Sequence, residues 1–334
     1  MEDRMESGKQ DNMNISTGAM GVSSEAAVAL LLTNGNEYRR DLQKKYGKFF
    51  LYFSAAALLL AGGFLLASFF VEDFLLLRYL SIGIGTLWLI CGIVILLFIF
   101  PEKAAVHFTE KILPGICEML DPELEYAPED GVPIADYRAS GLFPVRCKSY
   151  RYCDLITGSY RGKSVSFSNF QTTCEREITD TRGKKRIMEH VLFSGVFLTC
   201  GPMEGVTQNI LVIPLEEYEK MAAVLSDVSS PMLIFRKPVA LQNAEDFQEH
   251  FAVFSTDEEQ AKTFLTPERC ARICALRKEL EGPLCISYMP DHTYAAVGKM
   301  IDLSAHSIWS PLGNDEIRKP YQQLEQILRI PGSL

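Results

Sequence analysis

Two long apolar runs in the amino-terminal third limit what this chain can fold into more than any other feature of its sequence. The runs cover Phe49–Phe70 and Tyr79–Phe100, and neither contains Asp, Glu, Lys, Arg or His. Each is about as long as a bilayer-crossing helix, which needs roughly 20 residues. As a single helix, residues 49–100 would reach roughly 78 Å, far more than the hydrocarbon core of about 30 Å. The sequence therefore predicts a two-helix transmembrane hairpin over residues 49–100, with spans 49–70 and 79–100.

The charges that flank the two runs predict the orientation of the hairpin. The basic flanks are Arg39, Arg40, Lys44, Lys45 and Lys48 before the first run, and Lys103 and Lys111 after the second. The turn between the runs contains Arg78 beside Glu72 and Asp73. Because basic flanks stay on the cytoplasmic side, we expect a multi-pass protein of the cell (inner) membrane with both termini in the cytoplasm and the lipid bilayer as a partner.

Most of the net charge of the chain, which is −9, falls after the hairpin. The charges of residues 1–48 cancel and residues 49–100 contribute −1, which leaves −8 for residues 101–334. This acidic balance argues against a nucleic-acid partner, because phosphate binding needs a basic face. The segment is long enough to bury a core of its own. We expect a cytosolic domain that binds no nucleic acid.

The segments on either side of the hairpin differ in pattern. Residues 1–25 are polar without periodicity and are predicted to be disordered. Residues 26–48 are predicted to form a juxtamembrane helical segment. Apolar residues recur at helical spacing over residues 101–120, which predicts a connecting helix, kinked or broken at Pro114.

Residues 121–334 are predicted to form the cytosolic domain, in which strands predominate, with sub-blocks at 143–228 and 232–330. Residues 121–142 are predicted as a loop, and 172–189 as the end of a long hairpin that turns at 181–184. The predicted strands are 150–156, 164–171, 190–200, 209–214, 239–242, 251–255, 284–289 and 294–297, and the predicted helices are 215–225, 257–280 (restarting at Thr266) and 314–328. Strands and helices do not alternate as βαβ units. The fold class is therefore α+β: the transmembrane hairpin, then a mixed domain with antiparallel sheets and flanking helices.

The cysteines offer candidate chemistry but no clear motif. They are Cys91, Cys117, Cys147, Cys153, Cys174, Cys200, Cys270, Cys274 and Cys285. Their odd number and irregular spacing favour reduced thiols that fill the core over a disulfide framework. Cys270 and Cys274 would need further metal ligands, such as Cys285 and His292, so a buried thiol pair is the simpler interpretation. A Cys/His nucleophile pair stays open, with His107, His190, His250, His292 and His306 as the candidate bases.

Asp154 is the acidic residue that the sequence singles out, because it precedes Gly158 and Gly162 at the end of a predicted strand. It is either a ligand or acid residue, or a residue that shapes the strand end and turn while the glycines supply positive φ. The second interpretation is the simpler one. The segment GSYRG lacks the Gly-Lys-Ser/Thr ending of a phosphate loop.

Three segments together carry a family resemblance. They are Asp154, Leu155, Ile156, Gly158 and Gly162; then Phe193, Gly195 and Phe197; then Phe247, Phe251, Val253, Ser255, Asp257, Ala261, Leu265, Thr266 and Pro267. With the preceding hairpin, this order resembles the bacterial domain-of-unknown-function family 3137, over about residues 45–330. The resemblance implies a membrane-anchored cytosolic α+β domain and supplies no activity or catalytic residues.

Three functional hypotheses follow from these observations. The first is a non-catalytic interaction or scaffold module that the hairpin holds at the membrane, with a protein partner still to be identified. The alternative is a membrane-associated enzyme acting on lipid or cell-envelope intermediates. A third makes the hairpin an oligomerisation or transport subunit, with a homo-oligomer formed through it. The sequence predicts no catalytic residue, metal ligand or cofactor.

Overall fold

The computed structural model describes residues 22–67, 75–94, 105–143, 147–179, 185–225, 237–241, 244–303 and 311–334. The chain divides into two compact units. The first unit comprises residues 1–115 and 304–318, and the second comprises residues 116–303 and 319–334.

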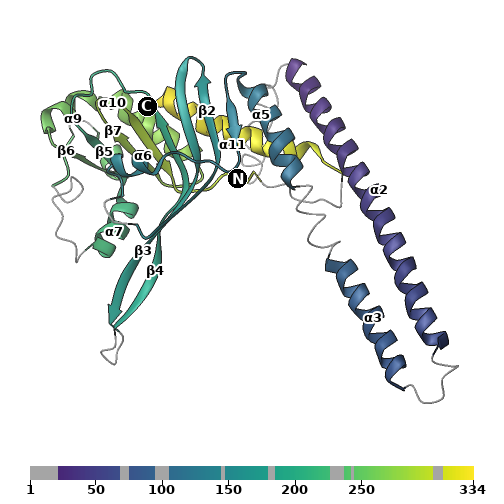
Figure 1. Ribbon diagram of the computed structural model, residues 1–334. Helices are drawn as coiled ribbons and strands as arrows, with labels where there is room; N and C mark the ends of the chain where they lie inside the picture. The colour runs from purple at the N-terminus through teal and green to yellow at the C-terminus, as the bar shows by residue number, and fades with distance from the viewer. Residues whose placement is uncertain are drawn as a thin grey trace, which may run out of the picture. The chain divides into compact units, whose positions relative to one another are not determined.

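Two helices, α2 (Val22–Ala67) and α3 (Leu75–Val94), dominate the first unit. Helix α2 runs without interruption through the predicted juxtamembrane segment into the first apolar run. The two helices lie side by side (Figure 1), and the rings of Phe53 and Trp88 are 4.1 Å apart between centroids. A Cβ at Gly92 would lie 3.2 Å from the ring of Phe50. The small residue Gly92 therefore lets α2 and α3 pack closely.

Within the described part of the chain, no helix combines the length and the apolar character that crossing a membrane requires. Residues 68–74 and 95–104 fall outside that part, so each predicted span is described only in part. Residues 1–21 of the predicted disordered segment also lie outside it. The transmembrane hairpin therefore stays a prediction.

The first unit also contains the segments that pack near the start of α2. The side chain of Asn36 donates to the carbonyl of Leu312 at 3.1 Å and accepts from its N–H at 2.6 Å. The connecting helix includes a π-helical segment, Phe108–Ile112, that leads directly into α5 (Leu113–Leu120). Pro114 does not break the helical course; it directly follows the π-helical turn, in which the N–H of Leu113 donates to the carbonyl of Phe108.

The second unit is built on one antiparallel sheet of eight strands in the order β1-β2-β3-β4-β8-β7-β5-β6. The strands are β1 (Glu125–Ala127), β2 (Ser149–Tyr160), β3 (Lys163–Thr179), β4 (Lys185–Cys200), β5 (Ile210–Pro214), β6 (Phe251–Ser255), β7 (Leu284–Tyr288) and β8 (Thr293–Val297). The α+β class with an antiparallel sheet and flanking helices is confirmed. Because β8 pairs with β4 and β7 pairs with β5, strands from both predicted sub-blocks share this sheet.

The register continues across the sheet and defines its two faces. One cross-strand row passes through Val165, Cys200, Thr293, Tyr288, Ile210 and Ser255. The helices of this unit are α6 (Ile134–Ala139), α7 (Leu215–Leu225), α8 (Glu245–Gln248), α9 (Glu258–Phe264), α10 (Pro267–Glu279) and the later part of α11 (Asn314–Ser333). The face of Tyr288 meets Phe264 of α9. The opposite face packs on Tyr137 of α6 and Met221 of α7.

Several predicted elements differ from those observed. The predicted loop 121–142 contains β1 and α6, because Tyr137 of α6 is buried among aromatic rings. Residues 239–241 form no strand, although the N–H of Val239 donates to the carbonyl of Val253 at 2.8 Å. The restart at Thr266 is confirmed, since its hydroxyl accepts from the N–H of Arg269 at 3.3 Å and Pro267 begins α10.

Candidate functional site

Asp154 lies at a β-bulge in the middle of β2 rather than at the end of a strand. The pairing of β2 with β3 shifts between Cys153 and Ile156, and the backbone of Asp154 has a φ of 62°. Positive φ is uncommon for residues other than glycine, and Asp is among the few that tolerate it. The bulge breaks the alternation of β2 and places the Asp154 carboxylate within reach of donors from β1 and β3.

Three side chains donate hydrogen bonds to this carboxylate. The hydroxyl of Tyr126 donates at 2.7 Å, the amide of Asn169 at 3.0 Å and the thiol of Cys153 at 3.1 Å. Burial raises the pKa of Tyr126, and its hydrogen bond to Asp154 raises it further. Asn169 also makes two hydrogen bonds of 2.9 Å with the backbone of Ile301. The cluster thus joins β1, β2, β3 and the segment after β8, which fits a shaping role for Asp154.

Six of the cysteines are buried: Cys117, Cys147, Cys174, Cys200, Cys270 and Cys285. Burial raises the pKa of Cys117 and Cys200 to about 12 and that of Cys270 to about 11, so these thiols stay protonated at neutral pH. Among the described residues, no three His, Cys, Asp or Glu side chains group in a way that could hold a metal ion. His306 lies outside the described residues. The structure therefore does not bring the candidate thiols and His292 together as a metal centre.

The strands β3 and β4 continue beyond the rest of the sheet as a two-stranded ribbon (Figure 1). Strand β2 pairs with β3 only as far as Thr173, and β8 pairs with β4 only from Val196 onward. We call residues 174–179 and 185–191 the β3–β4 arm. At its base, Lys148 forms ion pairs with Glu175 at 2.7 Å and with Glu189 at 2.5 Å. The long hairpin is confirmed, while its predicted turn at 181–184 lies outside the described residues.

Large apolar side chains of the arm face solvent. Ile187 is 69% exposed, Met188 is 49% exposed and Val191 is 57% exposed. Ile187 and Val191 lie on one face of β4 and Met188 lies on the other, because side chains alternate along a strand. Isolated two-stranded ribbons are marginally stable in water, and exposed apolar side chains that share a face mark interaction surfaces. The arm is therefore the part of the sheet best suited to contact another molecule.

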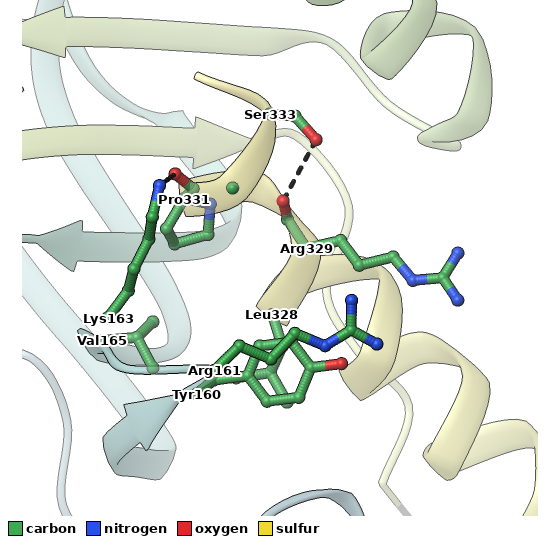
Figure 2. A pocket seen from close by; sticks show the side chains of 9 residues that line it. Tyr160, Arg161, Lys163, Val165, Leu328, Arg329, Pro331 and Ser333 are labelled. Atoms are coloured by element: carbon green, nitrogen blue, oxygen red, sulfur yellow. Dashed lines mark hydrogen bonds between the residues drawn. The ribbon is translucent and has the colours of Figure 1, made fainter.

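A second candidate site is a cavity of about 400 Å³ between the β2–β3 turn and the carboxyl-terminal end of α11 (Figure 2). We call it the basic pocket; it is lined by Tyr160, Arg161, Lys163, Val165, Leu328, Arg329, Pro331, Gly332 and Ser333. The turn is tight because Arg161 and Gly162 have φ values of 52° and 76°. Val165, Leu328 and Pro331 are buried, whereas the charged side chains lie at the rim. The pocket thus combines an apolar floor with a basic edge.

The three basic side chains of this pocket have different partners. Lys163 donates to the carbonyl of Pro331 at 2.7 Å. Arg329 pairs with Glu325 at 2.7 Å, which raises its pKa. The guanidinium of Arg161 lies over the ring of Tyr160, 5.1 Å from its centroid, and has no acidic partner among the described residues. In the sequence, the signal for this site is limited to Arg161 and Lys163 on either side of Gly162.

Comparison with known proteins gives one family and one solved structure. No curated protein matches the chain. The matching solved structure is the crystal structure of the mycobacterial trehalose monomycolate transport factor A, TtfA, with 10% identity, a TM-score of 0.28, and coverage of 63% of this chain and 88% of that chain. The family model that matches is described as a protein of unknown function (DUF3137), over residues 191–334. The part of the chain from β4 to the end of α11 therefore resembles this family, as the sequence motifs predict.

Proposed function

We propose that this protein is a membrane-anchored, non-catalytic interaction module whose β3–β4 arm binds a protein partner. In this proposal residues 49–100 hold the chain in the cell membrane, with both termini and the sheet domain in the cytoplasm. The observation that carries the proposal is the arm, a ribbon without neighbouring strands that exposes apolar side chains.

The helices of the first unit support the anchor. Leu58 and Leu59 of α2 are 74% and 78% exposed, and Leu87 of α3 is 60% exposed. Exposed apolar surface of this kind normally meets a membrane or a partner. The runs that contain these residues carry no charged side chain. Each Leu, Ile, Val or Phe near the centre of a span contributes about −0.3 to −0.6 kcal/mol to the free energy of membrane insertion. The basic residues before the first run support the cytoplasmic placement of both termini.

The arm supports a protein partner for two reasons. Among the described strands, only β4 pairs with β3 beyond Thr173, which leaves the outer edge of residues 175–179 for an additional strand. The exposed Ile187 and Val191, which share one face of the ribbon, would bury apolar surface on contact, at about 25 cal/mol per Å². The ion pairs of Lys148 with Glu175 and Glu189 connect the two strands at the base of the arm. They restrict its motion in the free protein, so binding a partner would cost less conformational entropy.

Site-specific photo-crosslinking in cells tests the arm. A photoreactive phenylalanine analogue replaces Ile187 in one version and the exposed Tyr152 of β2 in the control. We expect a discrete crosslinked product at position 187 and none at position 152. An equal set of products at both positions, or none at position 187 from an abundant and folded protein, would contradict the proposal. A product of twice the monomer mass would instead favour the homo-oligomer.

Alkaline carbonate extraction tests the anchor separately. The full chain is expected to stay in the membrane pellet, and alkaline phosphatase fused within the 71–78 turn is expected to be active, whereas fusion after Leu334 is expected to be inactive. Release of the chain by carbonate would refute the anchor. Active fusions at both positions would refute the orientation.

The alternative, an enzyme acting on lipid or cell-envelope intermediates, stays a hypothesis. It predicts that an alanine at Asp154 or at one of the cysteines abolishes a cellular phenotype while thermal stability is retained. Loss of the phenotype only in variants that also unfold would contradict it.

A further inference from the structure

We infer that the basic pocket binds a phosphate-bearing ligand, a role separate from that of the β3–β4 arm. The inference starts from the charges at its rim. Among the described residues, Arg161, Lys163 and Arg329 line the cavity and no acidic residue does. Glu325 pairs with Arg329, whereas the side chains of Arg161 and Lys163 form no ion pair with the described residues; the Asp121 carboxylate accepts only from the backbone N–H of Arg161, at 3.4 Å.

The geometry leaves donors free to face the cavity. Lys163 has three N–H donors and gives one to the carbonyl of Pro331. The planar guanidinium of Arg161 carries five donors. It lies over the ring of Tyr160 and donates no hydrogen bond to the described residues. In Figure 2 the Lys163 side chain reaches Pro331 on one side of the pocket, and the guanidinium groups of Arg161 and Arg329 lie on the other. Arginine forks bind phosphate oxygens in a bidentate manner, and lysine adds a point charge.

The simplest competing explanation is that these cations only stabilise the end of α11. Cations near a helix carboxyl terminus are favourable because the helix dipole is negative there, and Lys163 has that role toward Pro331. Arg161 does not, because it lies over Tyr160 rather than on a terminal carbonyl. The cavity of about 400 Å³ is also of the size of small-ligand sites, which begin near 300 Å³.

The pocket's composition defines the class of ligand. A phosphate group would meet the Arg161 guanidinium at the rim, and a small apolar portion would contact Val165 and Leu328 below. Both a soluble phosphorylated molecule and the headgroup of an anionic lipid have this chemistry, so the test includes one probe of each kind.

The test uses the purified full chain in neutral detergent at constant ionic strength. Isothermal titration calorimetry follows inorganic pyrophosphate in one series and dihexanoyl phosphatidic acid in another, with zwitterionic dihexanoyl phosphatidylcholine, which has no net charge, as the control lipid. The variant Arg161→Asn removes the charge and keeps a residue that tolerates positive φ. The matched control is Arg151→Asn, which removes one exposed positive charge from β2, the strand that precedes the turn, outside the pocket.

We expect saturable binding of at least one phosphate probe that weakens at least tenfold in Arg161→Asn, about 1.4 kcal/mol, and stays within twofold in Arg151→Asn. Glu325→Gln frees Arg329 and is expected to tighten binding severalfold, a gain that general destabilisation of the fold cannot produce. Pyrophosphate binding supports a soluble ligand, and binding of phosphatidic acid alone supports a lipid headgroup. No saturable binding of either probe, or equal losses in the Arg161 and Arg151 variants, would overturn the inference.

Discussion

Substitution of Gly195 in strand β4 is the most direct test of how the sheet packs. A Cβ at this position would lie 1.9 Å from the carbonyl oxygen of Val297 and 2.9 Å from the N of Lys299. Val297 is the last residue of β8, and its carbonyl accepts from the N–H of Lys299 at 2.8 Å in the turn that follows. The Gly195→Ala variant therefore forces backbone against a methyl group, with no flexible side chain to move aside.

The expected cost follows from that distance. Ordinary contact begins near 3.4 Å, so β4 and the turn must separate locally by about 1.5 Å. Overpacking of this kind costs about 1–3 kcal/mol, and each backbone hydrogen bond stretched beyond range adds about 1 kcal/mol. We expect Gly195→Ala to lower the free energy of unfolding by about 2–4 kcal/mol. At about 2–4 °C per kcal/mol for a domain of this size, the melting temperature would fall by roughly 4–16 °C.

Gly201→Ala is the matched control, because it makes the same chemical change just after β4, where a Cβ meets nothing within 4 Å. Its effect should lie within about 0.5 kcal/mol of zero. The assay is urea-dependent alkylation of the buried thiols Cys200 and Cys285, followed by mass spectrometry, which reports opening of the sheet in the full chain. Equal midpoints for the two alanine variants would refute the packing argument.

Three further predictions concern single contacts. Asn169→Ala should destabilise the sheet by about 2–3 kcal/mol, since it leaves the backbone N–H and carbonyl of Ile301 without their partner, and the same alkylation assay measures it against Gly201→Ala. Burial, and then the hydrogen bond to Asp154, raises the pKa of the Cys153 thiol to about 12. Because a raised pKa lowers the thiolate fraction, iodoacetamide should label Cys153 slowly at pH 8 and faster in Asp154→Asn. An unchanged labelling rate would contradict this. Thr266→Ala removes the cap of α10 and should cost about 1 kcal/mol, whereas Thr266→Ser should cost much less.

The sequence predicts much of the sheet because local pattern and burial agree there. The helix Leu215–Leu225 and the strand Phe251–Ser255 have the predicted bounds, and the hairpin of β7 and β8 falls where predicted. The loop predicted over residues 121–142 is wrong because α6 is short and lacks helical periodicity. Its position depends on Tyr137, which stacks on Phe170 at 4.7 Å and shares a hydrogen bond of 2.9 Å with Thr172. Those contacts come from distant parts of the chain and leave no local pattern.

The motif positions gain a physical explanation only from the structure. Gly158 has a φ of 143°, and a Cβ there would lie 2.0 Å from the carbonyl oxygen of Glu123. Gly195 faces a comparable approach of backbone, and Asp154 takes positive φ at a bulge. The resemblance therefore rests partly on places where strands approach closely, which indicates a shared sheet more directly than a shared activity.

The basic pocket escaped sequence reasoning because its two sides lie far apart in the chain. Arg161 and Lys163 flank a glycine in a two-residue hairpin turn, a position where charged residues are normally only solvated. Arg329 follows Glu325 by one helical turn, and that spacing alone predicts a surface ion pair. Only the packing of α11 against the sheet brings the three cations to one cavity. The arm was easier to predict, because a polar segment between two strands must protrude when no neighbouring strand is present. A site formed by consecutive residues can be predicted from the sequence. A site formed where a turn packs against a distant helix can be identified only from the tertiary structure.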